Sequence, residues 1–134
     1  KGGRIVAGGA RHALGGNFWQ PTVIADASEE MKLAREETFG PVAACFRFAS
    51  EEEVIQRANA TEYGLAAYFY TQNLQRVFRV SAALESGMIG INECAVSTEL
   101  APFGGVKESG LGREGSVLGI EEYLEVKALH IGGL

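Results

Sequence analysis

The sequence contains few of the residues that hold small proteins together through disulfides or metal ions. It has 2 cysteines and 2 histidines among 134 residues, and only 3 prolines. Two cysteines cannot supply the dense disulfide framework of a small secreted scaffold, and the cysteines and histidines lack the clustered spacing of metal ligands. With 46% hydrophobic and 22% charged residues, intrinsic disorder is also excluded. We expect an ordinary globular fold without a metal ion.

Positive charge is scarce as well. Lysine and arginine total 12 against 17 acidic residues, which gives a formal net charge of −5, and the basic residues are scattered singly. A nucleic-acid binder needs clustered cations to neutralise phosphates. No apolar run approaches the roughly 20 residues of a membrane span, and residues 1–4 lack the apolar core of a signal peptide. We expect a cytoplasmic protein that binds neither nucleic acid nor membrane, with any targeting segment upstream of Lys1.

Glycine is the residue in excess, with 18 copies, about twice the usual ~7%. Residues 1–16 and residues 104–119 hold six each, which predicts two places where the backbone turns sharply or approaches another segment closely. Residues 110–115 also satisfy the G-x-G-x-x-G pattern of dinucleotide-binding turns. That pattern needs a preceding strand and an acidic residue about 20 positions later, and both are missing. We interpret the second window as a shaped loop.

The centre of the chain, residues 41–92, alternates between strand-like and helix-like patterns. Short apolar runs typical of buried strands occupy residues 42–48, 65–70 and 88–92. Ser50 and Glu53 form a capping box for a first helix, and Asn73 caps a second helix that ends at Gly87. This alternation predicts an α/β fold with a parallel sheet covered on both faces.

The two ends of the chain are less regular. The expected elements there are short strands at residues 4–6 and 18–24, a helical turn or two at 28–35, a long loop at 93–113 and a short helix at 113–120. Apolar and charged residues then alternate over residues 123–131, a pattern typical of a strand. This strand has no neighbour in sequence, and an unpaired edge is a liability unless another segment covers it. We therefore expect an oligomer.

Reactive groups are sparse. Cys45 falls in a predicted buried strand and is interpreted as a small core residue. Cys94 falls in the long loop but has no nearby base to lower its pKa. Two segments, residues 36–42 and 97–112, combine polar, aromatic and glycine residues in a way that suggests a site, although a packed turn is the alternative for each.

These two segments resemble the C-terminal part of the NAD(P)-dependent aldehyde dehydrogenases. The resemblance extends essentially from end to end, and residues 91–134 are most similar to the branch that oxidises succinate semialdehyde. The matching motifs are Glu36-Glu37-Thr38-Phe39-Gly40-Pro41-Val42, Asn59 with Tyr63-Gly64-Leu65, Asn92, and the stretch from Pro102-Phe103-Gly104-Gly105 to Gly112-Arg113-Glu114.

The resemblance implies four site residues and the cofactor NAD or NADP. Glu37 matches a glutamate that accepts hydrogen bonds from the nicotinamide ribose, and Phe39 matches an aromatic beside the nicotinamide end. Ser97 matches a serine that helps bind the distal carboxylate of the substrate. Phe103 matches an aromatic wall of the aldehyde tunnel, which helps exclude water.

The resemblance also implies that the chain is a fragment. The family's catalytic cysteine, its water-activating glutamate, its oxyanion donors and its cofactor-binding domain all lie upstream of the matching region. Residues 1–120 would be part of the catalytic domain, and residues 121–134 would carry an oligomerisation strand at 124–131. No catalytic residue is expected in this chain, so we expect it to be inactive alone.

The full-length protein would oxidise succinate semialdehyde to succinate through a thioester on the upstream cysteine, as a homodimer or homotetramer. Two alternatives remain open. One is another aldehyde substrate, such as glutarate semialdehyde or a simple aliphatic aldehyde, and the other is a non-catalytic α/β module used for assembly.

Overall fold

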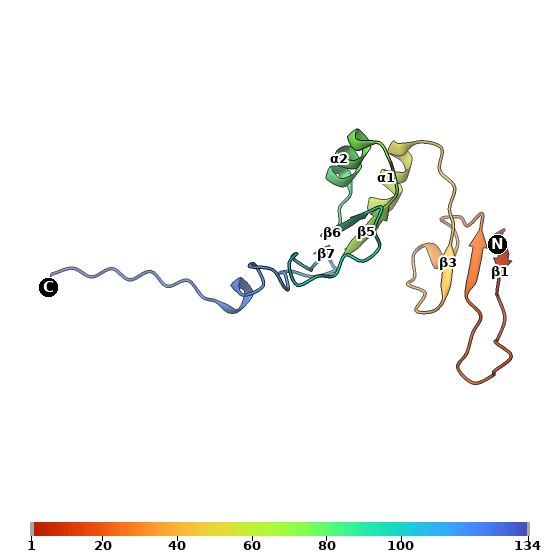
Figure 1. Cartoon of the computed structure of the whole chain (residues 1–134), viewed down its shortest axis with the longest axis horizontal. Helices are drawn as coiled ribbons and strands as arrows, with labels where there is room; N and C mark the ends of the chain where they lie inside the picture. The colour runs from red at the N-terminus through yellow and green to blue at the C-terminus, as the bar shows by residue number, and fades with distance from the viewer. Residues whose placement is uncertain (1, 134) are drawn as a thin grey trace. The chain divides into compact units, whose positions relative to one another are not determined.

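The computed structural model describes residues 2–133 (Figure 1) and divides the chain into two compact units, Lys1–Val54 and Ile55–Leu134. No helix in the described part of the chain is long and apolar enough to cross a bilayer.

The first unit contains a three-stranded sheet in the order β1-β2-β3. Its elements are β1 (Arg4–Ala7), β2 (Thr22–Ala25), the short 3-10 helix η1 (Lys32–Ala34) and β3 (Val42–Ala44). Strands β1 and β2 are antiparallel, whereas β2 and β3 are parallel. The predicted first strand and the helical turn are confirmed, while the second strand starts later than predicted, at Thr22.

The strand predicted at residues 42–48 differs in three respects. It is short, it pairs with β2 and not with the later strands, and it is not buried on both faces. Val42 and Ala44 are half-buried, but Ala43 and Cys45 are exposed, so no described residue buries the second face of this strand. The interpretation of Cys45 as a core residue is therefore wrong.

The second unit is built around a strand-helix-strand motif. Its elements, with α1 crossing the boundary from the first unit, are α1 (Glu51–Asn59), β4 (Tyr63–Gly64), β5 (Ala66–Phe69), α2 (Leu74–Ala83), β6 (Met88–Ile91), β7 (Val106–Lys107) and the 3-10 helix η2 (Glu121–Tyr123). Strands β5 and β6 are parallel and are joined through α2 (Figure 1), as the alternating pattern predicts. Strands β4 and β7 form a separate antiparallel pair.

Both predicted helix caps are confirmed. Ser50 Oγ accepts a hydrogen bond from Glu53 N at 3.1 Å, and Glu53 Oε2 accepts one from Ala49 N at 2.8 Å. Asn73 Oδ1 accepts a hydrogen bond from Arg76 N at 2.9 Å. Each cap satisfies backbone N–H groups that the first helical turn leaves without partners.

The helix predicted at residues 113–120 is wrong. Gly115 and Ser116 have φ values of 66° and 49°, a left-handed conformation that interrupts an α-helix. Residues 124–133 are not assigned to a strand, and Val126, Leu129 and Ile131 are exposed. The terminal strand stays a prediction, since its expected partner is another chain.

Apolar burial is low. Within residues 2–133 the buried apolar side chains are Met31, Val80 and Met88. The large apolar side chains that are exposed include Phe39, Leu111 and Val126. The chain carries apolar surface suited to contact with further polypeptide.

Candidate functional site

Phe39 lies in a pair of tight turns between η1 and β3, and Glu37 directly precedes them. Gly40 N donates to Thr38 O at 2.9 Å, and Val42 N donates to Gly40 O at 2.8 Å. Two successive three-residue turns of this kind hold the backbone on both sides of Gly40. Phe39 is 97% exposed, so its ring can contact a ligand or another part of the protein.

Thr22 attaches these turns to β2. Its backbone N–H donates to Pro41 O at 2.8 Å. Its hydroxyl donates to Gln20 O at 2.8 Å and accepts from Gly9 N at 2.9 Å. Thr22 is 6% exposed, and these bonds satisfy its polar atoms as burial requires. The position of these turns is therefore fixed by the sheet.

A cleft of about 590 Å³ lies beside Glu37. Its apolar lining includes Ile5, Ile24 and Met31. Its polar lining includes Glu37 and the pair formed by Lys32 and Glu36, whose Nζ and Oε1 atoms are 3.6 Å apart. The exposed carboxylate of Glu37 is a hydrogen-bond acceptor, so the cleft combines an apolar lining with an acceptor at its edge.

Ser97 lies on the loop that follows β6, which we define as the substrate loop, residues 93–102. Its side chain is exposed and forms no hydrogen bond within the described residues. The loop is attached near its far end, where Ser116 N donates to Glu99 O at 2.9 Å. The Ser97 hydroxyl can therefore donate to a ligand or to another part of the protein.

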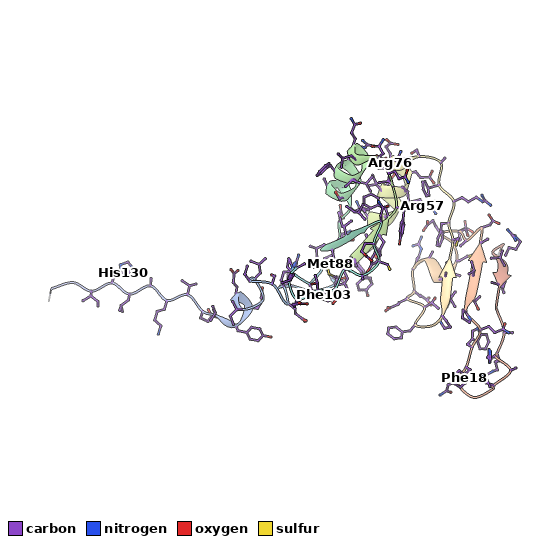
Figure 2. All side chains as sticks on the ribbon, in the orientation of Figure 1. Phe18, Arg57, Arg76, Met88, Phe103 and His130 are labelled. Carbon is purple, nitrogen blue, oxygen red and sulfur yellow. The ribbon has the colours of Figure 1, made fainter. Side chains whose placement is uncertain are left out.

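Phe103 begins a closed backbone loop directly after the substrate loop. Phe103 and Glu114 exchange two backbone hydrogen bonds of 2.8 Å. Arg113 Nη1 donates to Gly105 O at 2.8 Å and to Gly112 O at 2.7 Å, which joins the two arms. Phe103 is half-buried (labelled in Figure 2) and lines a cleft of about 660 Å³.

Two glycines of the second window stand where a side chain would collide. A Cβ on Gly104 would lie 2.6 Å from Gly112 O, and one on Gly105 would lie 2.6 Å from Ser109 Cβ. Real Cβ atoms do not approach other atoms so closely. The prediction that this window marks a close backbone approach is confirmed.

Lys107 and Ser109, to which the sequence patterns assign no role, hold this loop. Ser109 Oγ accepts a hydrogen bond from Gly64 N at 2.9 Å. Lys107 Nζ donates to the carbonyl oxygens of Asn59 and Thr61 at 2.9 and 3.1 Å. The sequence did indicate that these residues matter, because Asn59, Gly64, Lys107 and Ser109 all belong to the motifs that carry the family resemblance.

The four predicted site residues fall into two pairs. Glu37 and Phe39 lie in one short segment of the first unit, and Ser97 and Phe103 lie on adjoining segments of the second unit. Within residues 2–133 no three histidine, cysteine, aspartate or glutamate side chains are grouped so that they could hold a metal ion.

The sequence profile of the aldehyde dehydrogenase family matches residues 1–129. The chain is 60% identical to 3-sulfolactaldehyde dehydrogenase of Pseudomonas putida over 134 residues, which cover 100% of the chain and 28% of that protein. It is 59% identical to succinate-semialdehyde dehydrogenase [NADP(+)] of Escherichia coli, with coverage of 98% and 27%. It is 56% identical to glutarate-semialdehyde dehydrogenase of Pseudomonas aeruginosa, with coverage of 100% and 28%.

Solved protein structures are similar to this chain as well. An NADP-dependent enzyme of E. coli superposes with a TM-score of 0.91 at 60% identity, covering 94% of this chain and 26% of that one. The NAD+ complex of an aldehyde dehydrogenase from Bacillus cereus gives a TM-score of 0.89 at 44% identity, with the same coverage. The chain thus spans just over a quarter of the length of the curated relatives it matches. From its motifs, its fold and this similarity, the chain belongs to the aldehyde dehydrogenase family.

Proposed function

We propose that this chain is the C-terminal part of an NAD(P)-dependent aldehyde dehydrogenase that oxidises a small aldehyde with an anionic group at its far end. Succinate semialdehyde is the first candidate. The supporting observation is the similarity, over essentially the whole chain, to dehydrogenases named for succinate semialdehyde, glutarate semialdehyde and 3-sulfolactaldehyde. Each of these aldehydes carries a distal carboxylate or sulfonate, so the shared chemistry is an aldehyde with a remote anion.

The cleft beside Glu37 supports the cofactor part of this proposal. The exposed Glu37 carboxylate and the apolar lining of the cleft fit the nicotinamide and ribose end of the cofactor. The carboxylate would accept hydrogen bonds from ribose hydroxyls, and Phe39 would pack beside the nicotinamide ring. When bound, the nicotinamide takes up a hydride from the substrate. Both NAD and NADP remain possible, because the contacts to the adenosine half lie outside these residues.

Ser97 and Phe103 would act on the substrate side. The Ser97 hydroxyl, which has no partner within the described residues, would donate to the distal anion of the substrate. Phe103 would contribute an apolar wall that helps keep water from the reacting carbon. The cysteine that carries the thioester and the base that hydrolyses it would be supplied from outside this chain, and residues 1–120 would complete the catalytic domain.

The C-terminal segment would serve assembly. Residues 124–128 alternate apolar and charged side chains, and Val126 is fully exposed. We infer that this segment forms a strand by pairing with a neighbouring subunit, which would make the enzyme a homodimer or homotetramer.

The test is a substrate comparison with the full-length protein that carries this chain. Nicotinamide reduction is followed with succinate semialdehyde, glutarate semialdehyde and butanal, which has the same chain length as succinate semialdehyde but no anion. We expect kcat/KM to be at least tenfold higher for the anionic aldehydes, because a hydrogen bond to a charged group stabilises by about 1.5–3 kcal/mol. Equal values for butanal would contradict a substrate with a remote anion.

Ser97→Ala sharpens this comparison. The preference for succinate semialdehyde over butanal should fall, while kcat/KM for butanal stays unchanged. Ser81→Ala is the matched control, because the Ser81 hydroxyl bonds to Val77 O in its own helix. The non-catalytic alternative would be favoured if no aldehyde supported nicotinamide reduction.

A further inference from the structure

Asn92 stands at the point where β6 ends and the chain turns into the substrate loop. Its φ is 55°, in the left-handed region that few residues other than glycine adopt, asparagine being one of the exceptions. Its backbone N–H donates to Phe69 O at 3.0 Å. The backbone therefore leaves the β5–β6 ladder at this residue.

The side chain of Asn92 continues the ladder after the backbone has turned away. Asn92 Oδ1 accepts a hydrogen bond from Thr71 N at 2.8 Å, and Asn92 Nδ2 donates to Thr71 O at 2.7 Å. One amide thus satisfies both backbone groups of Thr71, as a paired residue of a neighbouring strand would. We call these two bonds the Asn92 amide clamp.

The next residues form a tight turn on the clamp. A Cβ on Gly90 would lie 2.3 Å from Glu93 O and 2.6 Å from Tyr68 Cδ1, so the turn folds back closely over β6. The Glu93 carboxylate accepts hydrogen bonds from Cys94 N at 2.7 Å and Ala95 N at 2.9 Å. These bonds to Ala95 and Cys94 lower the pKa of Glu93.

Ser97 follows this turn by two residues. The clamp and the Glu93 turn fix where the substrate loop starts, and the Ser116 contact to Glu99 fixes it near its other end. The Ser97 side chain has no bond of its own within the described residues, so its position depends on how these attachments direct the backbone.

We propose that Asn92 is a positioning residue for substrate selection, because its amide clamp sets the direction in which the substrate loop presents Ser97. This inference rests on the proposed role of Ser97 in binding the distal anion. Asn92 itself contacts no substrate; it acts through Thr71 and the loop backbone.

The test compares Asn92→Gly with Asn92→Asp in the full-length protein. Glycine adopts the left-handed backbone without strain. Asn92→Gly therefore removes the clamp but leaves the backbone conformation of this residue allowed. For Asn92→Gly we expect KM for succinate semialdehyde to rise at least tenfold, towards the ~100-fold that a misplacement of about 1 Å can cost. The kcat/KM for butanal should change less than about twofold. Aspartate keeps the acceptor for Thr71 N but lacks the amide donor. Asn92→Asp should therefore retain more of the preference for succinate semialdehyde over butanal than Asn92→Gly does.

Asn73→Ala is the matched control, because it removes the same amide from the cap of α2. It should destabilise the helix without changing the ratio of kcat/KM between the two substrates. An unchanged ratio in Asn92→Gly would overturn the proposal, as would an equal change in Asn73→Ala.

Amide hydrogen exchange gives a readout that does not depend on catalysis. In Asn92→Gly the amides of Thr71 and of residues 94–100 should exchange faster, while those of Phe103 and Glu114 keep their wild-type rates. Unchanged exchange in residues 94–100 would overturn the proposal. If the protein oxidised no anionic aldehyde, the proposed function would fail, and exchange would still decide whether Asn92 directs the loop.

Discussion

Lys107 forms an ion pair with Glu85, with 2.5 Å between Nζ and Oε2. The same ammonium donates to the carbonyl oxygens of Asn59, the last residue of α1, and of Thr61. A cation at a helix C-terminus satisfies carbonyl groups that the helix leaves without partners and interacts favourably with the helix dipole. Lys107 thereby joins the loop that carries Phe103 to α1 and to the segment between α2 and β6.

Lys107→Met should therefore cost more stability than Glu85→Gln. The lysine side chain is 24% exposed and bonds to three acceptors, so its loss should cost about 1–3 kcal/mol. The Glu85 side chain is 56% exposed, and an exposed ion pair contributes at most about 1 kcal/mol. Native-state hydrogen exchange of the β4 and β7 amides measures both costs locally. Equal costs would show that the carbonyl contacts contribute nothing.

Gly105→Ala should be strongly destabilising, unlike Gly40→Ala. The new methyl group at position 105 would lie 2.6 Å from Ser109 Cβ and 3.1 Å from Gly64 O, both on a closely packed segment. Overpacking of this kind costs about 1–3 kcal/mol. A Cβ on Gly40 would meet nothing within 4 Å, so that variant should stay within about 0.5 kcal/mol of wild type. Urea midpoints measured without cofactor compare the two, and similar midpoints would contradict the close approach at Gly105.

Asp26 should make the first unit sensitive to acid. A hydrogen bond from Arg47, with 2.7 Å between Nε and Oδ1, and then the charges of Arg47 and Arg4 lower the pKa of Asp26 below its ordinary value of 3.8. Because the folded-state pKa is the lower one, the stabilisation is present above pH 3.8 and is lost as the pH falls through the folded-state pKa.

Asp26→Asn tests this dependence, since asparagine tolerates the φ of 55° at this position. The stability difference between wild type and variant should shrink as the pH is lowered below about 4, and added salt should reduce it at neutral pH. Glu36→Gln removes an exposed carboxylate from the pair with Lys32 and serves as the control. A stability difference between wild type and Asp26→Asn that stays constant from neutral to acid pH would refute the stabilising role of the Asp26 carboxylate.

The chain expressed alone should not behave as a stable domain. Among residues 2–133 the buried apolar side chains are Met31, Val80 and Met88, and many apolar residues are exposed. The chain should therefore unfold with a broad transition, bind hydrophobic dyes and reduce no nicotinamide. Calorimetry and dye fluorescence would check this. A sharp, cooperative transition of a monodisperse species would instead favour the non-catalytic module.

Val126→Glu should weaken assembly of the full-length protein. Val126 is fully exposed in the single chain, and a charge on the apolar face of a pairing strand would be costly to bury. Lys127→Glu, on the opposite face of the same segment, should leave assembly nearly unchanged. Light scattering after size separation measures both masses. Loss of assembly in both variants would point to net charge, and loss in neither would reject this segment as the interface.

Local patterns were predictable from the sequence where local contacts decide the structure. The caps at Ser50 and Asn73 are such cases, since each uses atoms within a few residues of the helix start. The exposure of Cys45 was not predictable, because it depends on what covers the sheet. The helix expected at 113–120 failed because an apolar pattern does not reveal the left-handed backbone of Ser116.

The candidate site shows the same difference between local patterns and contacts made by distant residues. The candidate residues were predicted from motifs, whereas the contacts that hold their segments could not be. Lys107 reaches the Asn59 and Thr61 carbonyls across 48 and 46 positions of sequence, and Asn92 reaches Thr71 across 21. Contacts between distant positions leave no periodic signal, so the structure was needed to find them.

The substrate loop is fixed by contacts that leave the Ser97 side chain unused. Its attachments use the Asn92 amide, the Glu93 carboxylate and the backbone of Glu99, whereas the Ser97 hydroxyl makes no hydrogen bond within the described residues. Ser97 is therefore a position whose side chain can be exchanged on a loop that other residues hold in place. Under the role proposed for Ser97, its exchange should shift the choice among anionic aldehydes while the loop keeps its attachments.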